Sequence, residues 1–347
     1  MFKTYIGADV DSKMTELAVE RNGQVVCRRR VETSIVALKE FLSGVGGRKA
    51  LCLEEGPMAD WLYRNLKDEV DELVICDPRR NKLIACDGDK DDPIDAGKLA
   101  ELHRGGYLRA VHHSDSAERV LLKQWVGLYH DRVKDAVRQV NKIRARCRMH
   151  GMRPPRGFLS NAKIQKQWLA ELGVHGLRGQ LELLLPGLDA VRLQVRRSRH
   201  EMSRRTNGCD IVIRWQALPG VGLIRATTLL AYLDTPWRFA GPKKLWKYCG
   251  VGLVRTASGT DKKGRPRKGK LQLAWAVNRR LKGTVIGAAV SAIEQGNNVF
   301  AEYHRRLEQQ GVSPSNARHA VARKMLTVMW GMWKNNSRFE EALVCGE

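Results

Sequence analysis

The order of strand and helix signals in the first 110 residues constrains the fold of this 347-residue chain more than any other feature of its sequence. Short apolar runs, two of them joined by the hairpin signal Asn22-Gly23, predict strands at residues 4–9, 16–20, 24–31, 50–54 and 72–76. Apolar residues at helical spacing predict helices after the cap Ser34, at 57–66 and at 92–104. The resulting order, β-β-β-α-β-α-β-α, predicts a mixed sheet whose first three strands form a meander.

A sheet of this order is found in the α/β ribonuclease H-like fold, which we assign to a first domain at residues 1–112. An apolar stripe at spacings of three and four then predicts one long helix at 117–149. Further helices are predicted at 162–185 and 188–205, with no strand signal between them. We therefore interpret residues 113–208 as a helical arm with coiled-coil packing.

The third predicted domain, residues 209–347, is mostly α. Its longer helices are predicted at 226–233, 271–293, 300–309 and 315–333. Near its start, the segment LPGVG at 218–222 is typical of a helix-hairpin-helix element, in which Gly220 and Gly222 let backbone N–H groups approach a phosphate. A plain turn between two helices explains the same glycines and stays open as the alternative.

Charge is divided unevenly along a chain whose net charge is +24. Residues 1–115 hold 18 Lys+Arg and 21 Asp+Glu, whereas residues 116–347 hold 43 and 16. This asymmetry predicts that the second part binds a polyanion such as nucleic acid. Within it, a Gly-rich basic loop predicted to lie beside a phosphate backbone contains Lys262, Lys263, Arg265, Arg267, Lys268 and Lys270.

Membrane and metal-thiolate proteins fit this composition poorly. No apolar run approaches the roughly 18 residues that a membrane span needs, so no membrane partner is expected. The eight cysteines include no C-x-x-C pair, which argues against a zinc site and predicts a reduced, cytoplasmic protein.

Four carboxylates stand where an α/β sheet usually builds its site. Asp9 and Glu54 each end a predicted central strand, and Asp92 and Asp95 share one face at the start of a helix. Carboxylates that converge repel one another unless a divalent cation relieves the repulsion, and two Mg²⁺ ions so held support phosphoryl transfer. Each carboxylate taken alone also has an ordinary structural explanation: Asp92 as an N-cap, and Glu54 as the partner of an arginine in an ion pair.

Five segments, in order, resemble the DEDD transposases, which are the recombinases of insertion-sequence family one-ten and relatives of the Piv DNA invertases. The first three resemble RuvC-like motifs: YIGAD at 5–9, LEEGP at 53–57 and DPIDA at 92–96. The other two are LPGVG at 218–222, and YCGV at 248–251 with ASG at 257–259. The resemblance extends over nearly the whole chain.

The resemblance implies a RuvC-like catalytic domain that binds Mg²⁺ through Asp9, Glu54, Asp92 and Asp95. It also implies that Ser258, in the C-terminal transposase domain, is the nucleophile in site-specific recombination of a mobile element. The implied partners are donor and target DNA, a structured guide RNA encoded by the element, and further copies of the chain in a dimer or tetramer. The expected location is the bacterial cytoplasm, with action at the nucleoid.

Some assignments stay open at this point. Asp11 or Glu55 can replace its neighbour as metal ligand, and Asp89 and Asp91 are further candidates in their segment. A RuvC-like nuclease that hydrolyses branched DNA with metal-activated water is the alternative enzyme, in which Ser258 is only structural. A non-catalytic nucleic-acid-binding protein is the third possibility, although it leaves the four carboxylates unexplained.

Overall fold

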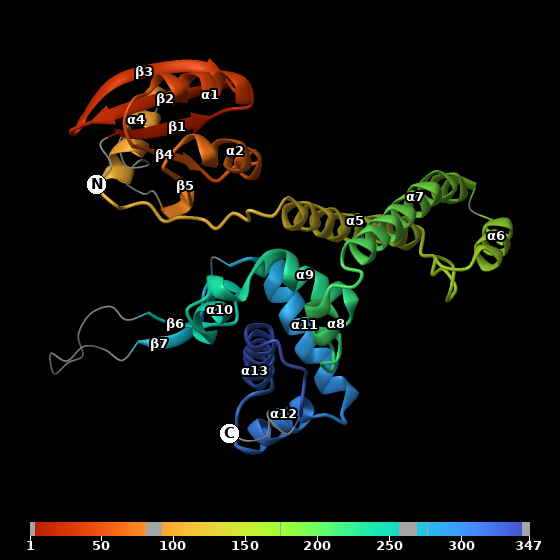
Figure 1. The fold of residues 1–347 in the computed structure, drawn as a ribbon. Coiled ribbons are helices and arrows are strands. Elements are labelled where there is room, and N and C mark those ends of the chain that lie inside the picture. The colour runs from red at the N-terminus through yellow and green to blue at the C-terminus, as the bar shows by residue number, and fades with distance from the viewer. Residues whose placement is uncertain (1–3, 81–91, 174, 257–268, 276, 342–347) are drawn as a thin grey trace, which may run out of the picture. The chain divides into compact units, whose positions relative to one another are not determined.

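The computed structural model describes residues 4–80, 92–173, 175–256, 269–275 and 277–341, and the chain divides into two compact units, Met1–Ala117 and Glu118–Glu347. The first unit is built on a five-stranded sheet of order β3-β2-β1-β4-β5 (Figure 1). Its strands are β1 (Thr4–Val10), β2 (Met14–Arg21), β3 (Gln24–Glu32), β4 (Lys49–Glu54) and β5 (Glu72–Cys76). β1 pairs antiparallel with β2 and parallel with β4, so the predicted meander and mixed sheet are confirmed.

Helices cover both faces of this sheet. On one face, α1 (Ile35–Gly44) and α2 (Ala59–Leu66) pack their apolar sides on alternate strand residues, in a core that includes Ile6, Leu17, Leu38, Leu51 and Leu62. Ser34 starts α1 as predicted, because its hydroxyl accepts the backbone N–H of Ala37 at 3.3 Å. On the other face lies α4 (Asp92–Arg104), and short helical turns occur at η1 (Lys67–Glu69) and η2 (Pro78–Arg80).

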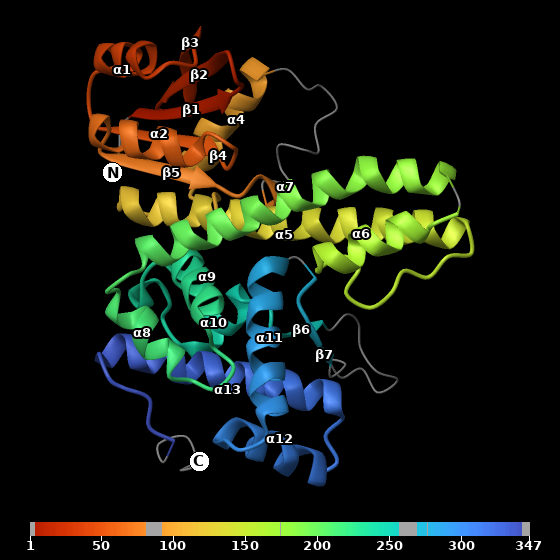
Figure 2. The ribbon, with the colours of Figure 1, turned by 90° about the vertical axis from the view of Figure 1, so that its right-hand side faces the viewer.

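The second unit begins with three helices that we call the arm. They are α5 (Ala117–Met149), α6 (Ala162–Glu171) and α7 (His175–Arg205), and α5 and α7 lie side by side in Figure 2. Buried apolar residues of α5 and α7 and of the segments before and after α6, among them Ile143, Phe158, Leu172 and Leu181, form the core of the arm. No helix of the described residues is both long enough and apolar enough to cross a membrane, and this includes the long helices α5 and α7.

The helices of the arm break at a different position from the predicted one, and its coiled-coil packing stays a prediction. The two helices predicted at 162–185 and 188–205 are instead α6, which ends at Glu171, and α7, which continues through Pro186. Proline removes one helical hydrogen bond, but the buried side chains of Leu181, Leu185 and Leu188 keep this part of α7 on the core of the arm. Tertiary packing therefore outweighs the local helix-breaking signal.

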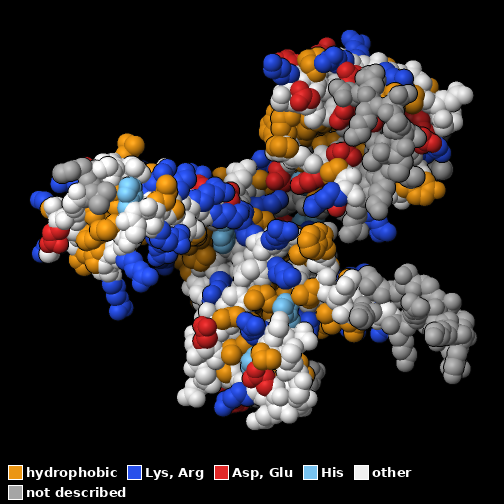
Figure 3. All heavy atoms as spheres, turned by 180° about the vertical axis from the view of Figure 1, so that it is seen from behind, with side chains coloured by type: hydrophobic (Ala, Val, Ile, Leu, Met, Phe, Trp, Pro, Cys, Tyr) orange, Lys and Arg blue, Asp and Glu red, His pale blue; other side chains and the backbone are white. Residues whose placement is uncertain are grey.

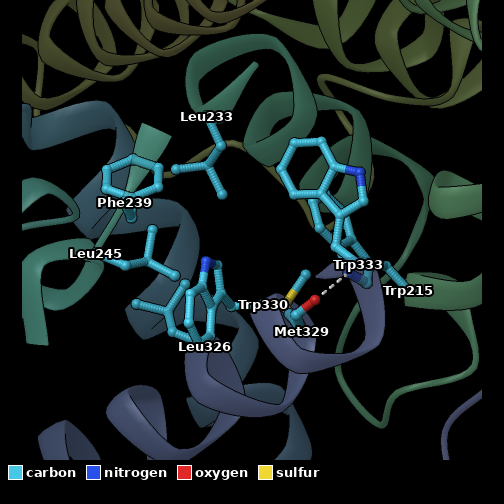
Figure 4. Close-up of a pocket in the computed structure, with 8 residues that line it drawn as sticks. All are labelled: Trp215, Leu233, Phe239, Leu245, Leu326, Met329, Trp330 and Trp333. Atoms are coloured by element: carbon cyan, nitrogen blue, oxygen red, sulfur yellow. Dashed lines mark hydrogen bonds between the residues drawn. The ribbon is translucent and has the colours of Figure 1, made fainter. Parts of the chain in front are cut away.

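In the described residues, the rest of the second unit packs six helices around one core. They are α8 (Asp210–Gln216), α9 (Leu223–Leu233), α10 (Pro242–Tyr248), α11 (Arg279–Gln295), α12 (Val299–Gln309) and α13 (Pro314–Asn335), with a short turn at η3 (Pro236–Arg238). In the core, Trp215 donates its indole N–H to the carbonyl oxygen of Met329 at 3.0 Å (Figure 4). The cavity lined by the residues of Figure 4 measures about 10 Å³, which leaves no room for a ligand larger than water.

A small β-hairpin was not predicted. β6 (Leu253–Thr256) and β7 (Lys270–Leu273) pair antiparallel, so the helix predicted to start at residue 271 is wrong over its first turns. The helix begins only at Arg279, where the side chain of Asn278 accepts two backbone N–H groups as an N-cap. Residues 270–273 alone are too short to show a strand pattern, and their pairing partner lies across the loop that joins β6 to β7.

Candidate active site

Two of the predicted metal ligands, Asp9 and Glu54, lie at the same edge of the sheet. β1 and β4 run parallel with Ala8 opposite Leu53, so the next residues of the two strands are neighbours as well. Both side chains are half-buried. The expectation that these carboxylates meet at the carboxyl ends of adjacent strands agrees with this register.

Helix α4 brings its first turn to the level of Asp9. Near the other end of the helix, the ring of His103 lies edge-on to Tyr5, with 5.6 Å between ring centroids. Two residues further along β1, a Cβ atom on Gly7 would lie only 2.0 Å from the carbonyl oxygen of Ala96. The helix therefore runs antiparallel to β1, and two residues beyond Gly7 the strand reaches the start of α4.

Glu54 points to the same face of the sheet. Cys52, two residues earlier in β4, donates its S–H to the carbonyl oxygen of Leu99 at 3.2 Å, which places Cys52 against α4. Side chains alternate along a strand, so Glu54 also faces α4. Asp92 and Asp95 belong to the first turn of that helix. Backbone geometry thus brings the end of β1, the end of β4 and the first turn of α4 to one corner of the first unit.

The environment of Asp95 fits a cation. Its Oδ1 atom is buried and has no hydrogen-bond partner among the described residues. A buried carboxylate oxygen without a partner is costly, and a bound divalent cation would satisfy it. The side chain of Asp92 lies outside the description, and the described residues by themselves contain no group of three or more His, Cys, Asp or Glu side chains placed to hold a metal ion.

The two alternative ligands are engaged in other contacts. Asp11 is exposed in the turn after β1, where backbone hydrogen bonds from Ser12 and Lys13 lower the pKa of its carboxyl group. Glu55 follows β4 and its carboxylate lies 2.7 Å from Nε2 of His113. Asp89 and Asp91 lie outside the described residues.

A buried histidine beside this edge was missed by the sequence analysis. The side chain of His113 is 1% exposed, and its ring nitrogens lie 2.6 Å from Oδ1 of Asp60 and 2.7 Å from Oε2 of Glu55. Burial opposes protonation of the ring, but the hydrogen bonds and charges of the two carboxylates outweigh it and raise the pKa of His113 to about 9. We call these three residues the His113 cluster. No local pattern around His113 could have indicated partners more than 50 residues away.

The predicted phosphate-binding glycines of the second unit have different surroundings. Gly220 has φ +75°, and a Cβ atom there would lie 2.3 Å from the carbonyl oxygen of Ala288 in α11. Its own carbonyl oxygen accepts a hydrogen bond from Arg225 at 2.6 Å. Close packing against α11 is thus sufficient to explain Gly220. Gly222 is exposed at the N-cap of α9, and the helix-hairpin-helix interpretation stays a prediction.

Most of the basic loop lies outside the described residues. This holds for the predicted nucleophile and for all but one of the predicted cations: Ser258, Lys262, Lys263, Arg265, Arg267 and Lys268. The loop joins β6 to β7, and Thr256 pairs with Lys270, so its two ends lie together. At the base of the hairpin, Arg323 in α13 donates a hydrogen bond to the carbonyl oxygen of Val251 at 3.1 Å.

Comparisons with known proteins agree with this reading of the chain. Residues 6–148 match the model of the DEDD transposases of IS110 type, and residues 214–305 match that of the "Transposase IS116/IS110/IS902 family". The chain is also similar to a protein of Sinorhizobium fredii (strain NBRC 101917 / NGR234) described as "Putative transposase y4qE". The two are 23% identical over 364 residues, which is 95% of this chain and 88% of the relative.

The chain belongs to the IS110 family of DEDD transposases. The first family match covers α5 and the sheet, including the edge at which Asp9 and Glu54 lie. The second covers α9 to α11 and the β6–β7 hairpin. DEDD-type transposase domains typically use divalent metal ions, which agrees with the chemistry of the sheet edge.

A transposase acts on DNA, and this IS110-family member has a strongly basic surface on the arm. Figure 3 shows Lys and Arg side chains gathered along it. The exposed cations of α5 and α7 include Lys134, Arg138, Lys142, Arg144, Arg146, Arg148, Arg196, Arg197 and Arg199. Many cations spread along two long helices suit a polyanion better than a small anion.

Proposed function

We propose that this transposase is a site-specific recombinase that cuts and exchanges DNA strands through a Mg²⁺-dependent carboxylate site and a serine nucleophile. The observation that carries the proposal is the register of β1 and β4, which makes Asp9 and Glu54 neighbours on the face that α4 covers. The buried Oδ1 atom of Asp95, without a hydrogen-bond partner among the described residues, supports a cation there.

In this proposal Asp9, Glu54, Asp92 and Asp95 hold the metal. Bound Mg²⁺ supplies a Lewis acid that polarises a scissile phosphate and offsets the charge that develops on it. The protein supplies the orientation: two ligands come from adjacent strands and two from one helical turn. Since Gly7 lets α4 approach β1 closely, the distance between these two sources is set by backbone packing.

Ser258 is the proposed nucleophile. Its Oγ attacks the phosphorus, and an Oγ–P bond forms as the bond from phosphorus to one deoxyribose oxygen breaks. The serine proton leaves Oγ, and the departing deoxyribose oxygen becomes a hydroxyl group. The phosphoserine conserves the phosphodiester energy, so a hydroxyl end of another strand can reverse the step and join the strands without ATP. The cations proposed to hold the DNA are Lys262, Lys263, Arg265, Arg267, Lys268 and Lys270.

The proposed partners are donor DNA, target DNA, a structured guide RNA and further copies of the chain in a dimer or tetramer. The basic arm supports nucleic-acid binding by the second unit, because neutralised phosphates release counterions and strengthen association. The helix-hairpin-helix turn with Gly220 and Gly222 is proposed as an additional phosphate contact.

A suicide DNA substrate, which prevents religation, tests the nucleophile. We expect a protein–DNA adduct on a denaturing gel with the wild-type chain and with Ser291→Ala, and its complete loss with Ser258→Ala. Ser291 is the matched control because it lies in α11, within the same family match but away from the β6–β7 hairpin. Cleaved strands without an adduct, undiminished in Ser258→Ala, would instead favour the nuclease that uses metal-activated water.

A further inference from the structure

Two adjacent glutamates lie at the end of β4, Glu54 as its last residue and Glu55 directly after it, and the structure separates them. Glu54 faces α4, whereas Glu55 belongs to the His113 cluster. We propose that His113 is a positioning residue that holds Glu55 out of the metal site and so presents Glu54 alone as a ligand. This inference rests on the metal site proposed above and concerns how the chain selects one of two equivalent carboxylates.

The backbone directs the two glutamates to opposite sides. Glu54 pairs with Cys76 in the sheet, and the N–H of Glu55 still donates to the carbonyl oxygen of Cys76 at 2.8 Å. The backbone hydrogen bonding of the sheet therefore extends to the N–H of Glu55, and consecutive side chains alternate between faces. On the side away from α4, Asp60 in the first turn of α2 approaches the same histidine.

The hydrogen bonds require a charged ring. Both nitrogens of His113 lie within 2.7 Å of carboxylate oxygens, and a neutral imidazole has only one N–H to donate. The protonated ring donates to both and places one positive charge between two negative ones. Without it, Glu55 and Asp60 would bring two negative charges together beside an edge that already carries the predicted metal ligands.

The position of the ring is itself fixed. The N–H of Val111 donates to the carbonyl oxygen of Ile75 at 2.7 Å, which ties the segment before His113 to β5. The ring of Tyr63 in α2 lies against His113, with 5.4 Å between centroids. The histidine thus joins the start of α2, the end of β4 and the segment after β5. A carboxylate held in this way cannot turn toward α4 without breaking its hydrogen bond to the ring.

Binding of Mn²⁺ to the full-length chain, measured by electron paramagnetic resonance, tests the proposal without a DNA substrate. We expect Glu54→Gln to weaken Mn²⁺ binding at least about 10-fold, as loss of a ligand should. His113→Gln should weaken it about 10-fold, within the range known for residues that orient ligands. The double variant His113→Gln with Glu55→Gln should recover most of this loss, because an amide at position 55 no longer competes with Glu54 for the ion. His112→Gln, the same change at the exposed neighbouring residue, should have no effect.

Asp60→Asn provides a second variant that keeps the shape of the cluster. It removes one of the two charges that hold the ring, and we expect an intermediate loss of Mn²⁺ affinity of about 3-fold. Unchanged affinity in His113→Gln and Asp60→Asn, with only a lower melting temperature, would overturn the positioning role while the metal site stands. A larger loss of Mn²⁺ affinity in the single variant Glu55→Gln than in Glu54→Gln would also overturn it. A wild-type chain that binds no Mn²⁺ would refute the metal site itself, and this inference with it.

Discussion

The two units of this transposase present charge in opposite ways. The first, with 18 Lys+Arg and 21 Asp+Glu, places Asp9 and Glu54 side by side at one edge of its sheet, whereas the second, with 43 and 16, spreads exposed cations along its helices. A small hard cation needs a few oxygens in register, while a polyanion is held by the number and spacing of many charges. Function in the first unit should therefore depend on single carboxylates, whereas function in the second should depend on the total number of cations.

The largest expected effect comes from the carboxylates. We predict that Asp9→Asn, Glu54→Gln, Asp92→Asn or Asp95→Asn each lowers recombination at least about 1000-fold, since removal of a metal ligand removes charge stabilisation from the reacting phosphate. The melting temperature should change little. Asp11→Asn, in the exposed turn after β1, is the control and should retain activity. Two ligand variants with near wild-type recombination in Mg²⁺ would show that the residue set is wrong.

Glycines at close helix approaches should affect stability in both units. Gly7→Ala and Gly220→Ala each place a Cβ atom within 2.3 Å of a backbone oxygen, and Gly220 also has positive φ. We expect each to lower the free energy of unfolding by about 3 kcal/mol, as overpacking against backbone does. Gly222→Ala meets open space and should cost little. Urea unfolding measures these differences; weaker DNA binding by Gly220→Ala at unchanged stability would instead support the phosphate-binding interpretation.

The stability of the two units should depend on pH in opposite ways, because each contains a buried or half-buried histidine with a shifted pKa. In the first unit, the pKa of His113 is raised to about 9, whereas in the second, burial, Arg280 and Lys134 lower the pKa of His130 to about 4, against the opposing charge of Asp131. His130 lies 3.1 Å from the hydroxyl oxygen of Thr228, and His113 faces Glu55, Asp60 and Tyr63.

The signs follow from the ordinary histidine pKa of 6.5. Protonated His113 stabilises the fold fully below pH 6.5, and this contribution is lost as pH rises through about 9. Neutral His130 carries no penalty above pH 6.5, and stability falls as pH drops toward 4, because only the unfolded state gains a proton. We expect losses of about 2 kcal/mol for His113 and about 1 kcal/mol for the more exposed His130. Melting curves recorded over this pH range should lack the loss at high pH in His113→Gln and the loss at low pH in His130→Gln.

The smallest effect concerns single cations. Replacing Arg144 and Arg148 on the arm by Gln should reduce the slope of log affinity for DNA against log salt by about 2, because each phosphate contact releases counterions. Arg28→Gln with Arg29→Gln on β3 is the matched control, since these arginines are also exposed but belong to the acidic unit. Fluorescence anisotropy over a salt series measures both slopes. Equal reductions of the slope in both double variants would show that the two units do not differ in how their cations contribute to DNA binding.

Local signals predicted the first unit well. The Asn22-Gly23 turn, the cap Ser34 and the apolar runs define the order of strands and helices, and the structure confirms that order and the meander. Prediction was poorer in the second unit, where α7 continues through Pro186 and β7 replaces the start of a predicted helix. In both cases the deciding contacts come from residues distant in the chain, which a local pattern does not contain.

The sequence by itself determined which residues end the central strands and how charge is divided between the units, because strand alternation and composition are local properties. Only the tertiary structure decided what surrounds those residues. Gly7 is required because α4 packs on it and Gly220 because α11 does, and Glu55 finds its hydrogen-bond partner in a histidine 58 residues further along the chain. Such contacts depend on which face of the sheet each element packs against, and the packing of the whole unit sets that choice.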